Sequence, residues 1–173
     1  MPTVKPGQDF PGITLPKAGG GKLSLSAGEG RDFRLIIIYR GLHCPNCKAQ
    51  LTEVQDRLED LADAGITAAA ASMDGKERAE QARSKWHITQ FDIGYNLTRS
   101  DAKQLGLFLS AAEFEQEPAI FAEPVMFLLE PGNTLHAAWI QSAPFARPSL
   151  DDIIHAAKFV AEKDYPARGT LSD

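Results

Sequence analysis

Residues 34–64 read RLIIIYRGLHCPNCKAQLTEVQDRLEDLADA, and this stretch decides the fold that we expect for the chain. Its first part, from Leu35 to Tyr39, is a continuous apolar run with the length and β-branched content of a strand buried on both faces. A helix should begin at Pro45 and continue to a capping Gly65, because proline suits the first turn and apolar residues then recur every three or four positions. A CxxC pair therefore lies where a strand leads into a helix.

The two cysteines of this junction occupy positions at which thiols become reactive. Cys44 should stand at the helix N-terminus, where unpaired backbone N–H groups and the helix dipole favour the thiolate, and Arg40 and His43 can add positive charge. Its pKa should therefore fall below that of a free thiol. Cys47 lies one turn further along the same side, near enough to form a disulfide yet more shielded. We interpret Cys44 as the attacking cysteine and Cys47 as the resolving cysteine.

The composition is that of an ordinary globular protein. The chain has 173 residues, of which 43% are hydrophobic and 24% charged, so we expect a single domain over 1–173 with a loose tail over 164–173. The net charge of -5 argues against nucleic acid and anionic membranes as partners, since both require a basic face. No apolar run reaches the length of a signal peptide core or a membrane span. We therefore expect a cytoplasmic protein with no membrane partner.

The cysteine count narrows the chemistry further. Two cysteines at CxxC spacing cannot form the disulfide framework of a secreted domain, and in a cytosolic α/β chain they indicate redox or metal chemistry. Zinc, or a cluster shared between two subunits, is disfavoured, because a zinc site needs four ligands and no histidines stand at ligand spacing. The histidines are His43, His87, His136 and His155. We expect no metal and no cofactor.

The remaining elements alternate as in an α/β protein, with hairpins at both ends of the series. The strands that we expect, besides the central one, lie within 13–15, 23–25, 66–71, 91–97, 125–129 and 134–140. The further helices that we expect lie within 74–86, 101–105 and 149–162. Asp74 and Glu77 have the spacing of a capping box for the first of these helices.

Residues 111–123 have the composition of a loop in which four glutamates surround two phenylalanines. Such a segment is either the rim of an active site or a solvated insertion, and a run of like charges favours the solvated insertion. The four acidic residues are Glu113, Glu115, Glu117 and Glu123.

The residues at the cysteines resemble a known family. The segment YRGLHCPNC, Tyr39 to Cys47, is similar to the YRGxxCPxC segment that the peroxiredoxin-like AhpC/TSA (redoxin) family of the thioredoxin-fold superfamily places after its first core strand. Weaker similarities follow in the family's order at PGQDFPGITLP, SMD, LGLF and PVMFLLEPGNTL. The resemblance covers roughly residues 5–160. It implies an α/β thioredoxin-like fold, with a central mixed β-sheet flanked by helices and an N-terminal β-hairpin extension.

The resemblance also implies a thiol-dependent antioxidant oxidoreductase. In that family the attacking cysteine cleaves the O–O bond of a peroxide and becomes a sulfenic acid, and a second thiol then closes a disulfide. Cys44 would attack and Cys47 would resolve. The implied partners are a peroxide or disulfide substrate, a thioredoxin-, glutaredoxin- or glutathione-type reductant and, as is common in the family, a second copy in a homodimer. The supporting residues would be Arg40, His43, Pro45 and Pro124, the last as the loop proline that is cis in thioredoxin folds.

Two departures from the family pattern keep other functions open. Peroxiredoxins hold the peroxide with a Pro-x-x-x-Thr/Ser-x-x-Cys motif and a later arginine, but here the motif positions are Ile37 and Gly41, and Pro124 stands about where the arginine would. The sequence Cys-Pro-Asn-Cys is instead similar to that of glutaredoxin-like and DsbA-like proteins. Thiol–disulfide exchange is therefore the main alternative to peroxide reduction. A thioredoxin-fold binding module with inactive cysteines is the second.

Overall fold

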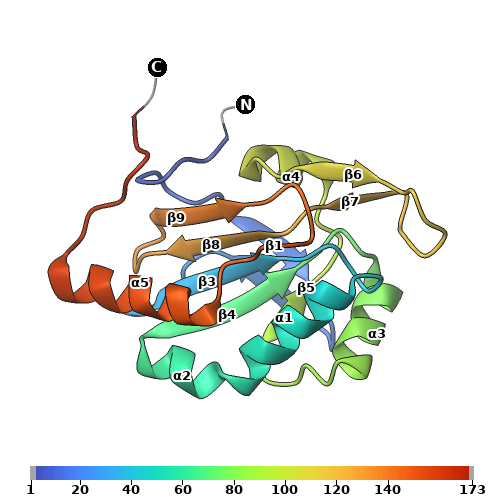
Figure 1. Cartoon of the computed structure of the whole chain (residues 1–173), viewed down its shortest axis with the longest axis horizontal. Helices are drawn as coiled ribbons and strands as arrows, with labels where there is room; N and C mark the ends of the chain where they lie inside the picture. Colours follow the sequence, from blue (N-terminus) through green and yellow to red (C-terminus); the bar gives the residue numbers. More distant parts are fainter. Residues whose placement is uncertain (1–2, 172–173) are drawn as a thin grey trace.

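The computed structural model describes residues 3–171, which form an α/β fold (Figure 1). The strands are β1 (Ile13–Pro16), β2 (Lys22–Leu25), β3 (Phe33–Ile38), β4 (Ile66–Ala71), β5 (Asp92–Gly94), β6 (Leu109–Ala111), β7 (Ile120–Ala122), β8 (Val125–Leu129) and β9 (Leu135–Ile140). The helices are α1 (Pro45–Asp56), α2 (Leu58–Asp63), α3 (Lys76–Lys85), α4 (Arg99–Leu105) and α5 (Leu150–Lys163).

A five-stranded mixed sheet in the order β5-β4-β3-β8-β9 forms the centre of the fold. β3 lies in its middle, parallel to β4 and antiparallel to β8. Its residues from Leu35 to Ile38 are fully buried, because both faces of the sheet are covered. The predicted central strand and the mixed thioredoxin-like sheet are therefore confirmed.

The two faces of β3 support separate hydrophobic cores, since successive side chains of a strand point to opposite sides. Leu35 and Ile37 pack toward α1, α2, α3 and α5, in the same cluster as the two cysteines. Ile36 and Ile38 pack toward α4 and the β1–β2 hairpin, which is the predicted N-terminal extension. Figure 1 shows this hairpin behind the central sheet and α5 in front of it. The reactive segment is thus anchored to the helical side of the core.

Two local predictions are wrong. The helix expected to run from Pro45 to Gly65 is broken at Arg57, whose φ is -116° and whose side chain pairs with Asp151 of α5. The expected capping box is absent, because α3 starts after Gly75 without a side-chain cap and the Asp74 carboxylate bonds to the turn that precedes Cys44. At Asp74 a tertiary partner therefore takes the place of the expected local cap.

Residues 112–119 of the segment 111–123 form the expected loop, but the ends of the segment belong to two strands that the composition did not indicate. β6 and β7 form a two-stranded antiparallel hairpin in which Ser110 lies opposite Phe121. Phe121 is buried, and burial of this ring holds β7 against the body of the protein. The predicted second hairpin, β8–β9, and the last helix, N-capped by Ser149, are confirmed.

The first and last segments of the described chain lie close together. Residues 165–171 contain no helix or strand, and Lys5 Nζ lies 3.5 Å from the carbonyl oxygen of Leu171. The last two residues of the expected tail, 172–173, lie outside the described residues, and the extent of the single domain stays a prediction. Within residues 3–171 no helix is both long and apolar enough to cross a membrane.

Candidate active site

The two cysteines lie at the start of α1, as the sequence predicts. Cys44 is the N-cap residue, and its Sγ accepts a hydrogen bond of 3.2 Å from the backbone N–H of Cys47. Cys47 lies within the first turn, where its Sγ accepts the backbone N–H of Arg40 at 3.3 Å. Both thiols are free and buried, with Cys44 only 1% exposed. The structure therefore represents the dithiol form, and Pro45 is the first residue of the helix, as predicted.

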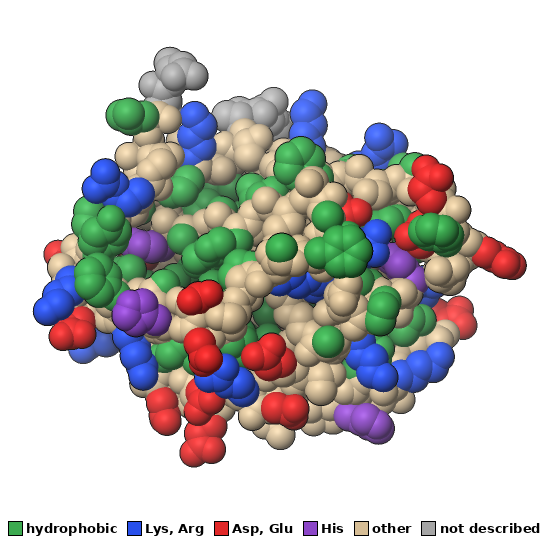
Figure 2. All heavy atoms as spheres, viewed as in Figure 1, with side chains coloured by type: hydrophobic (Ala, Val, Ile, Leu, Met, Phe, Trp, Pro, Cys, Tyr) green, Lys and Arg blue, Asp and Glu red, His purple; other side chains and the backbone are tan. Residues whose placement is uncertain are grey.

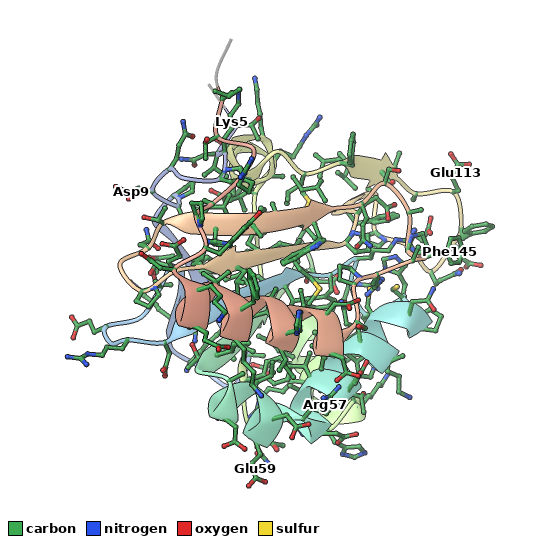
Figure 3. The ribbon with its side chains drawn as sticks, turned by 60° about the vertical axis from the view of Figure 1, so that its left-hand side comes forward. Lys5, Asp9, Arg57, Glu59, Glu113 and Phe145 are labelled. Atoms are coloured by element: carbon green, nitrogen blue, oxygen red, sulfur yellow. The ribbon has the colours of Figure 1, made fainter. Side chains whose placement is uncertain are left out.

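Arg147 lies beside both sulfur atoms, although no local pattern in the sequence points to it. Its Nη2 is 3.1 Å from Cys47 Sγ and 3.7 Å from Cys44 Sγ. Its Nη1 donates to Gln50 Oε1 at 2.7 Å, and its Nε donates to the carbonyl oxygen of Pro144 at 3.0 Å. Figure 3 shows the segment that carries Phe145 beside the start of α1. Arg147 makes no ion pair with a carboxylate of residues 3–171, so its positive charge is available to the sulfur atoms.

The two thiols have different affinities for protons. The pKa of Cys44 is lowered to about 5, because the Cys47 thiol and backbone N–H donate hydrogen bonds to its sulfur and the side chains of Arg40 and Arg147 stabilise the thiolate. Burial, followed by the adjacent sulfur of Cys44, raises the pKa of Cys47 above its usual value. At neutral pH the pair therefore consists of a Cys44 thiolate and a Cys47 thiol. This difference agrees with the roles inferred from the sequence.

Arg40 is held by the β6–β7 hairpin. Its Nε lies 3.0 Å from Glu123 Oε2, its Nη2 lies 3.7 Å from Glu117 Oε1, and its guanidinium carbon lies 4.7 Å from the centre of the Phe121 ring. Ser110 Oγ donates to the other oxygen of Glu123 at 2.6 Å. The solvated interpretation of this acidic segment is therefore wrong for Glu117 and Glu123, which belong to the rim of the site. The one feature of the sequence that indicated burial of Glu123 is its position directly after the short apolar run Ile120–Ala122.

The turn between β3 and Cys44 depends on Asp74, for which the sequence pattern predicts a helix cap instead. Its Oδ2 accepts the backbone N–H of Leu42 at 2.8 Å, and its Oδ1 accepts Arg78 Nε at 2.9 Å. Gly41 has a φ of 137°, and a Cβ atom on it would lie 2.8 Å from the Asp74 carboxylate. A threonine therefore does not fit here. The departure from the family motif at this position is a requirement of the turn.

His43 lies at the edge of the site, packed against the ring of Phe121 at 4.8 Å between ring centres. Its Nδ1 lies 3.4 Å from Arg78 Nη2. Burial and the charge of Arg40 lower the pKa of His43, so the ring is neutral at pH 7. Because an arginine nitrogen can only donate, Nδ1 accepts and Nε2 carries the proton. That Nε2 is buried and has no hydrogen-bond partner within residues 3–171.

Pro124 differs from the expectation raised by the resemblance. No peptide bond in residues 3–171 is cis, so the bond before Pro124 is trans. The chain is extended on both sides of this bond, because the Glu123 N–H bonds to the carbonyl oxygen of Phe108 and the Pro124 carbonyl oxygen accepts the N–H of Gln141. Pro124 therefore links β7 directly to β8. Within the described part of the chain, no cluster of three or more histidine, cysteine or acidic residues is arranged to hold a metal ion.

A thiolate and a thiol at a helix N-terminus, on a mixed sheet of this order, define a thiol-based oxidoreductase of the thioredoxin fold. Comparison with protein-family models matches residues 6–138 to the AhpC/TSA family. Because this match covers well over half of the sequence, the chain belongs to the AhpC/TSA family. It is a peroxiredoxin-like thiol oxidoreductase, as the resemblance implied. Among curated protein sequences no significant match was found.

Solved structures of peroxiredoxins share the fold at low sequence identity. A cysteine-to-serine mutant of peroxiredoxin 6 of Arenicola marina is 18% identical, with a TM-score of 0.77 over 98% of this chain and 81% of that chain. A cysteine-to-serine mutant of PrxQ of Xylella fastidiosa is 16% identical, with a TM-score of 0.72 over 93% and 99%. Peroxidoxin BcpB of Mycobacterium tuberculosis is 15% identical, with a TM-score of 0.71 over 90% and 96%. At these identities the likeness concerns the fold.

Proposed function

We propose that this chain reduces hydroperoxides, with Cys44 as the attacking thiolate and Cys47 as the resolving thiol. The observation that carries this proposal is the burial of a low-pKa thiolate beside an unpaired guanidinium. Cys44 is 1% exposed, so any substrate must displace part of its surroundings, and a small hydroperoxide requires less displacement than a protein disulfide does. A protein disulfide is harder to accommodate, because its own sulfur atoms must come into line with Cys44 Sγ. The geometry therefore favours peroxide reduction over exchange with protein disulfides.

The reaction balances in two steps. The Cys44 thiolate attacks one peroxide oxygen, an S–O bond forms as the O–O bond breaks, and Cys44 becomes a sulfenic acid. The other oxygen leaves as an alkoxide or hydroxide and takes a proton from solvent to give an alcohol or water. The Cys47 sulfur then attacks the sulfenic acid, which releases water and closes the Cys44–Cys47 disulfide. A thioredoxin-, glutaredoxin- or glutathione-type thiol returns the two electrons, which fits a reducing compartment such as the cytoplasm.

The charged groups of the site have distinct roles in this proposal. Arg147 stabilises the thiolate and the negative charge that develops on the leaving oxygen, because no carboxylate of the described chain neutralises it. Arg40 is partly neutralised by Glu117 and Glu123, so it contributes less net charge. The free Nε2–H of His43 supplies a further donor at the edge of the site. These donors take the place of the threonine and arginine that the family motif lacks here.

The test is the rate at which the fully reduced protein reacts with hydrogen peroxide, followed by stopped flow and intact mass. We expect a rate far above that of a free thiol and a product that has lost two hydrogens. Cys44→Ser should abolish the reaction, whereas Cys47→Ser should complete one turnover and stop at a sulfenic acid that dimedone traps. A rate equal to that of a free thiolate, or equal loss of the first step in both variants, contradicts the proposal.

The two alternatives predict different results with the same variants. A thiol–disulfide oxidoreductase would react with peroxide no faster than a simple thiolate, and Cys47→Ser would trap protein partners as mixed disulfides. A binding module with inactive cysteines would do neither. Peroxide kinetics and mixed-disulfide trapping together therefore separate all three functions.

A further inference from the structure

Cys47 must lose its proton as it resolves the sulfenic acid, and the surroundings of its sulfur atom determine how. Cys47 is 0% exposed, so bulk water does not reach the thiol. Within residues 3–171 its Sγ accepts two hydrogen bonds, one of 3.3 Å from the backbone N–H of Arg40 and one of 3.1 Å from Arg147 Nη2. Both groups are donors and cannot act as a base. Tyr39 lies in the same buried cluster, and burial raises its pKa, so its hydroxyl stays neutral.

Arg147 is the cation that faces Cys47. Its Nη2 is 3.1 Å from Cys47 Sγ and 3.7 Å from Cys44 Sγ, so it lies nearer to the resolving sulfur than to the attacking sulfur. Its other nitrogens are held by Gln50 Oε1 at 2.7 Å and by the carbonyl oxygen of Pro144 at 3.0 Å. These two contacts involve neither sulfur atom. The position of the guanidinium therefore does not depend on the oxidation state of the cysteines.

The space around this guanidinium is open to small molecules on one side. A pocket between α1 and the segment before α5 is lined by residues that include Gln50, Phe145 and Arg147. Figure 2 shows basic side chains recessed at this place, whereas the acidic side chains of the same face lie over α2 and the later turns of α1 and at the far end of the β6–β7 hairpin. The charge beside the sulfur atoms is therefore positive.

The charge of Cys44 opposes ionisation of Cys47 only in the dithiol form. Burial contributes most to the raised pKa of Cys47, and the hydrogen bond to the Cys44 sulfur and its negative charge contribute next. Arg147 acts in the opposite direction, through its charge and its hydrogen bond. When peroxide converts the Cys44 thiolate into a neutral sulfenic acid, the effect of the Cys44 charge vanishes and that of Arg147 remains.

We infer that Arg147 is a catalytic residue of both steps: it first stabilises the Cys44 thiolate and, once Cys44 is oxidised, stabilises the negative charge that develops on Cys47 as this sulfur attacks. The inference rests on the proposed function, which supplies the sulfenic acid. In the second step an S–S bond forms between Cys47 and Cys44, and the S–O bond of the sulfenic acid breaks. The leaving hydroxide takes the proton that Cys47 loses and becomes water. The step is balanced without a further oxidant, reductant or base.

The first test observes Cys47 by itself and uses no peroxide. Cys44→Ser leaves one cysteine and places an uncharged group where the sulfenic acid would be. The ultraviolet absorbance of the thiolate, taken as a difference from a Cys44→Ser/Cys47→Ser variant, should show Cys47 ionising at least about one pH unit below the second thiol of the unmodified protein. Adding Arg147→Met should raise this pKa by at least about one unit, because only the Arg40 N–H remains as a donor. Adding Arg168→Met, at an exposed arginine, should leave it unchanged.

The second test measures closure of the disulfide. With excess hydrogen peroxide, closure is a first-order step whose rate does not depend on the peroxide concentration, so it is separated from the attack by Cys44. Intact mass of acid-quenched samples gives the fraction of sulfenic acid that remains. We expect closure in Arg147→Met to be at least about tenfold slower than in the unmodified protein and in Arg168→Met. Arg147→Lys, which keeps a cation, should slow closure and raise the pKa of Cys47 less than Arg147→Met does.

Several results would overturn the inference. One is a pKa of Cys47 that Arg147→Met changes by less than about 0.3 units, and another is closure within about twofold of the unmodified rate. Equal effects of Arg147→Lys and Arg147→Met overturn it too, because the charge would then be irrelevant. Circular dichroism checks that each variant is folded. Failure of the proposed function looks different: the reduced protein would react with peroxide no faster than a free thiolate, while the pKa of Cys47 measured without peroxide would still respond to Arg147→Met.

Discussion

Replacing Arg147 with methionine tests whether one guanidinium sets the reactivity of Cys44. Arg147 Nη2 lies 3.7 Å from Cys44 Sγ, and no carboxylate of residues 3–171 pairs with it. Methionine keeps an unbranched apolar side chain at this position and removes the charge together with the donors. Arg40 is a less informative target, because its removal would leave Glu117 and Glu123 buried without their cation.

The distance sets the size of the expected effect. Two unit charges 3.7 Å apart attract by about 4.5 kcal/mol at an effective dielectric constant of about 20. Since one pKa unit corresponds to about 1.4 kcal/mol, the upper limit is a shift of about 3 units. Solvent screening at the half-buried Arg147 reduces this, and the hydrogen bonds from Cys47 to the thiolate persist. We therefore expect the pKa of Cys44 to rise from about 5 by about 1–2 units.

The assay is the rate of alkylation by iodoacetamide as a function of pH, together with the ultraviolet absorbance of the thiolate. The matched control is Arg168→Met, at an exposed arginine of the C-terminal segment, which should titrate like the unmodified protein. At pH 8 Cys44 is ionised in both variants, so any loss of peroxide reactivity at that pH reflects weaker stabilisation of the transition state. We expect the peroxide rate constant of Arg147→Met to be about 10- to 100-fold lower than that of the unmodified protein. A pKa within about 0.3 units of that of the unmodified protein would refute the electrostatic role of Arg147.

Three further predictions follow from the same contacts. The lowered pKa of Cys44 means that its thiolate is lost as the pH falls through about 5, so the peroxide rate should halve near that pH and be constant from about 6 to 8; a midpoint near 8.5 would contradict the assigned pKa. Gln50→Glu places a carboxylate against the Nη1 of Arg147, so thiolate titration should show a higher pKa of Cys44; an unchanged pKa would show that the charge of Arg147 is irrelevant. Gly41→Thr introduces a side chain at a φ of 137° and against Asp74, so urea unfolding should show a loss of about 2–4 kcal/mol; a stable, more active variant would contradict our account of the turn.

The parts of the fold that were predictable are those that local chemistry determines. The run from Leu35 to Ile38 is short and rich in β-branched residues, which favours a buried strand, and Pro45 favours the helix start, so the placement of both cysteines followed from adjacent residues. Arg147 was not predictable, because it lies 103 positions after Cys44 and its surroundings carry no local motif. Its role depends on how the segment before α5 crosses the start of α1.

The acidic segment shows a second limit of composition. Exposed charge runs and buried ion pairs contain the same residue types, and only the position of a countercharge distinguishes them. Glu123 is buried and pairs with Arg40, which follows the end of β3. Glu113 and Glu115 meet no such cation in the described chain and stay exposed. The interpretation as a solvated insertion was therefore correct for half of the cluster and wrong for the half that borders the site.

The absence of the family's threonine at Gly41 and the presence of Arg147 beside the thiolate have linked explanations. Asp74 holds the backbone N–H of Leu42, which leaves no room for a side chain at Gly41, so this turn cannot supply a hydroxyl donor to a peroxide. The donors that remain beside the thiolate come from other directions, and Arg147 is the one whose charge is not shared with a carboxylate. A site with fewer donors has less redundancy. Loss of Arg147 should therefore slow the reaction with peroxide more than loss of His43 does, and similar rates for Arg147→Met and a His43→Phe variant would argue that another group holds the peroxide.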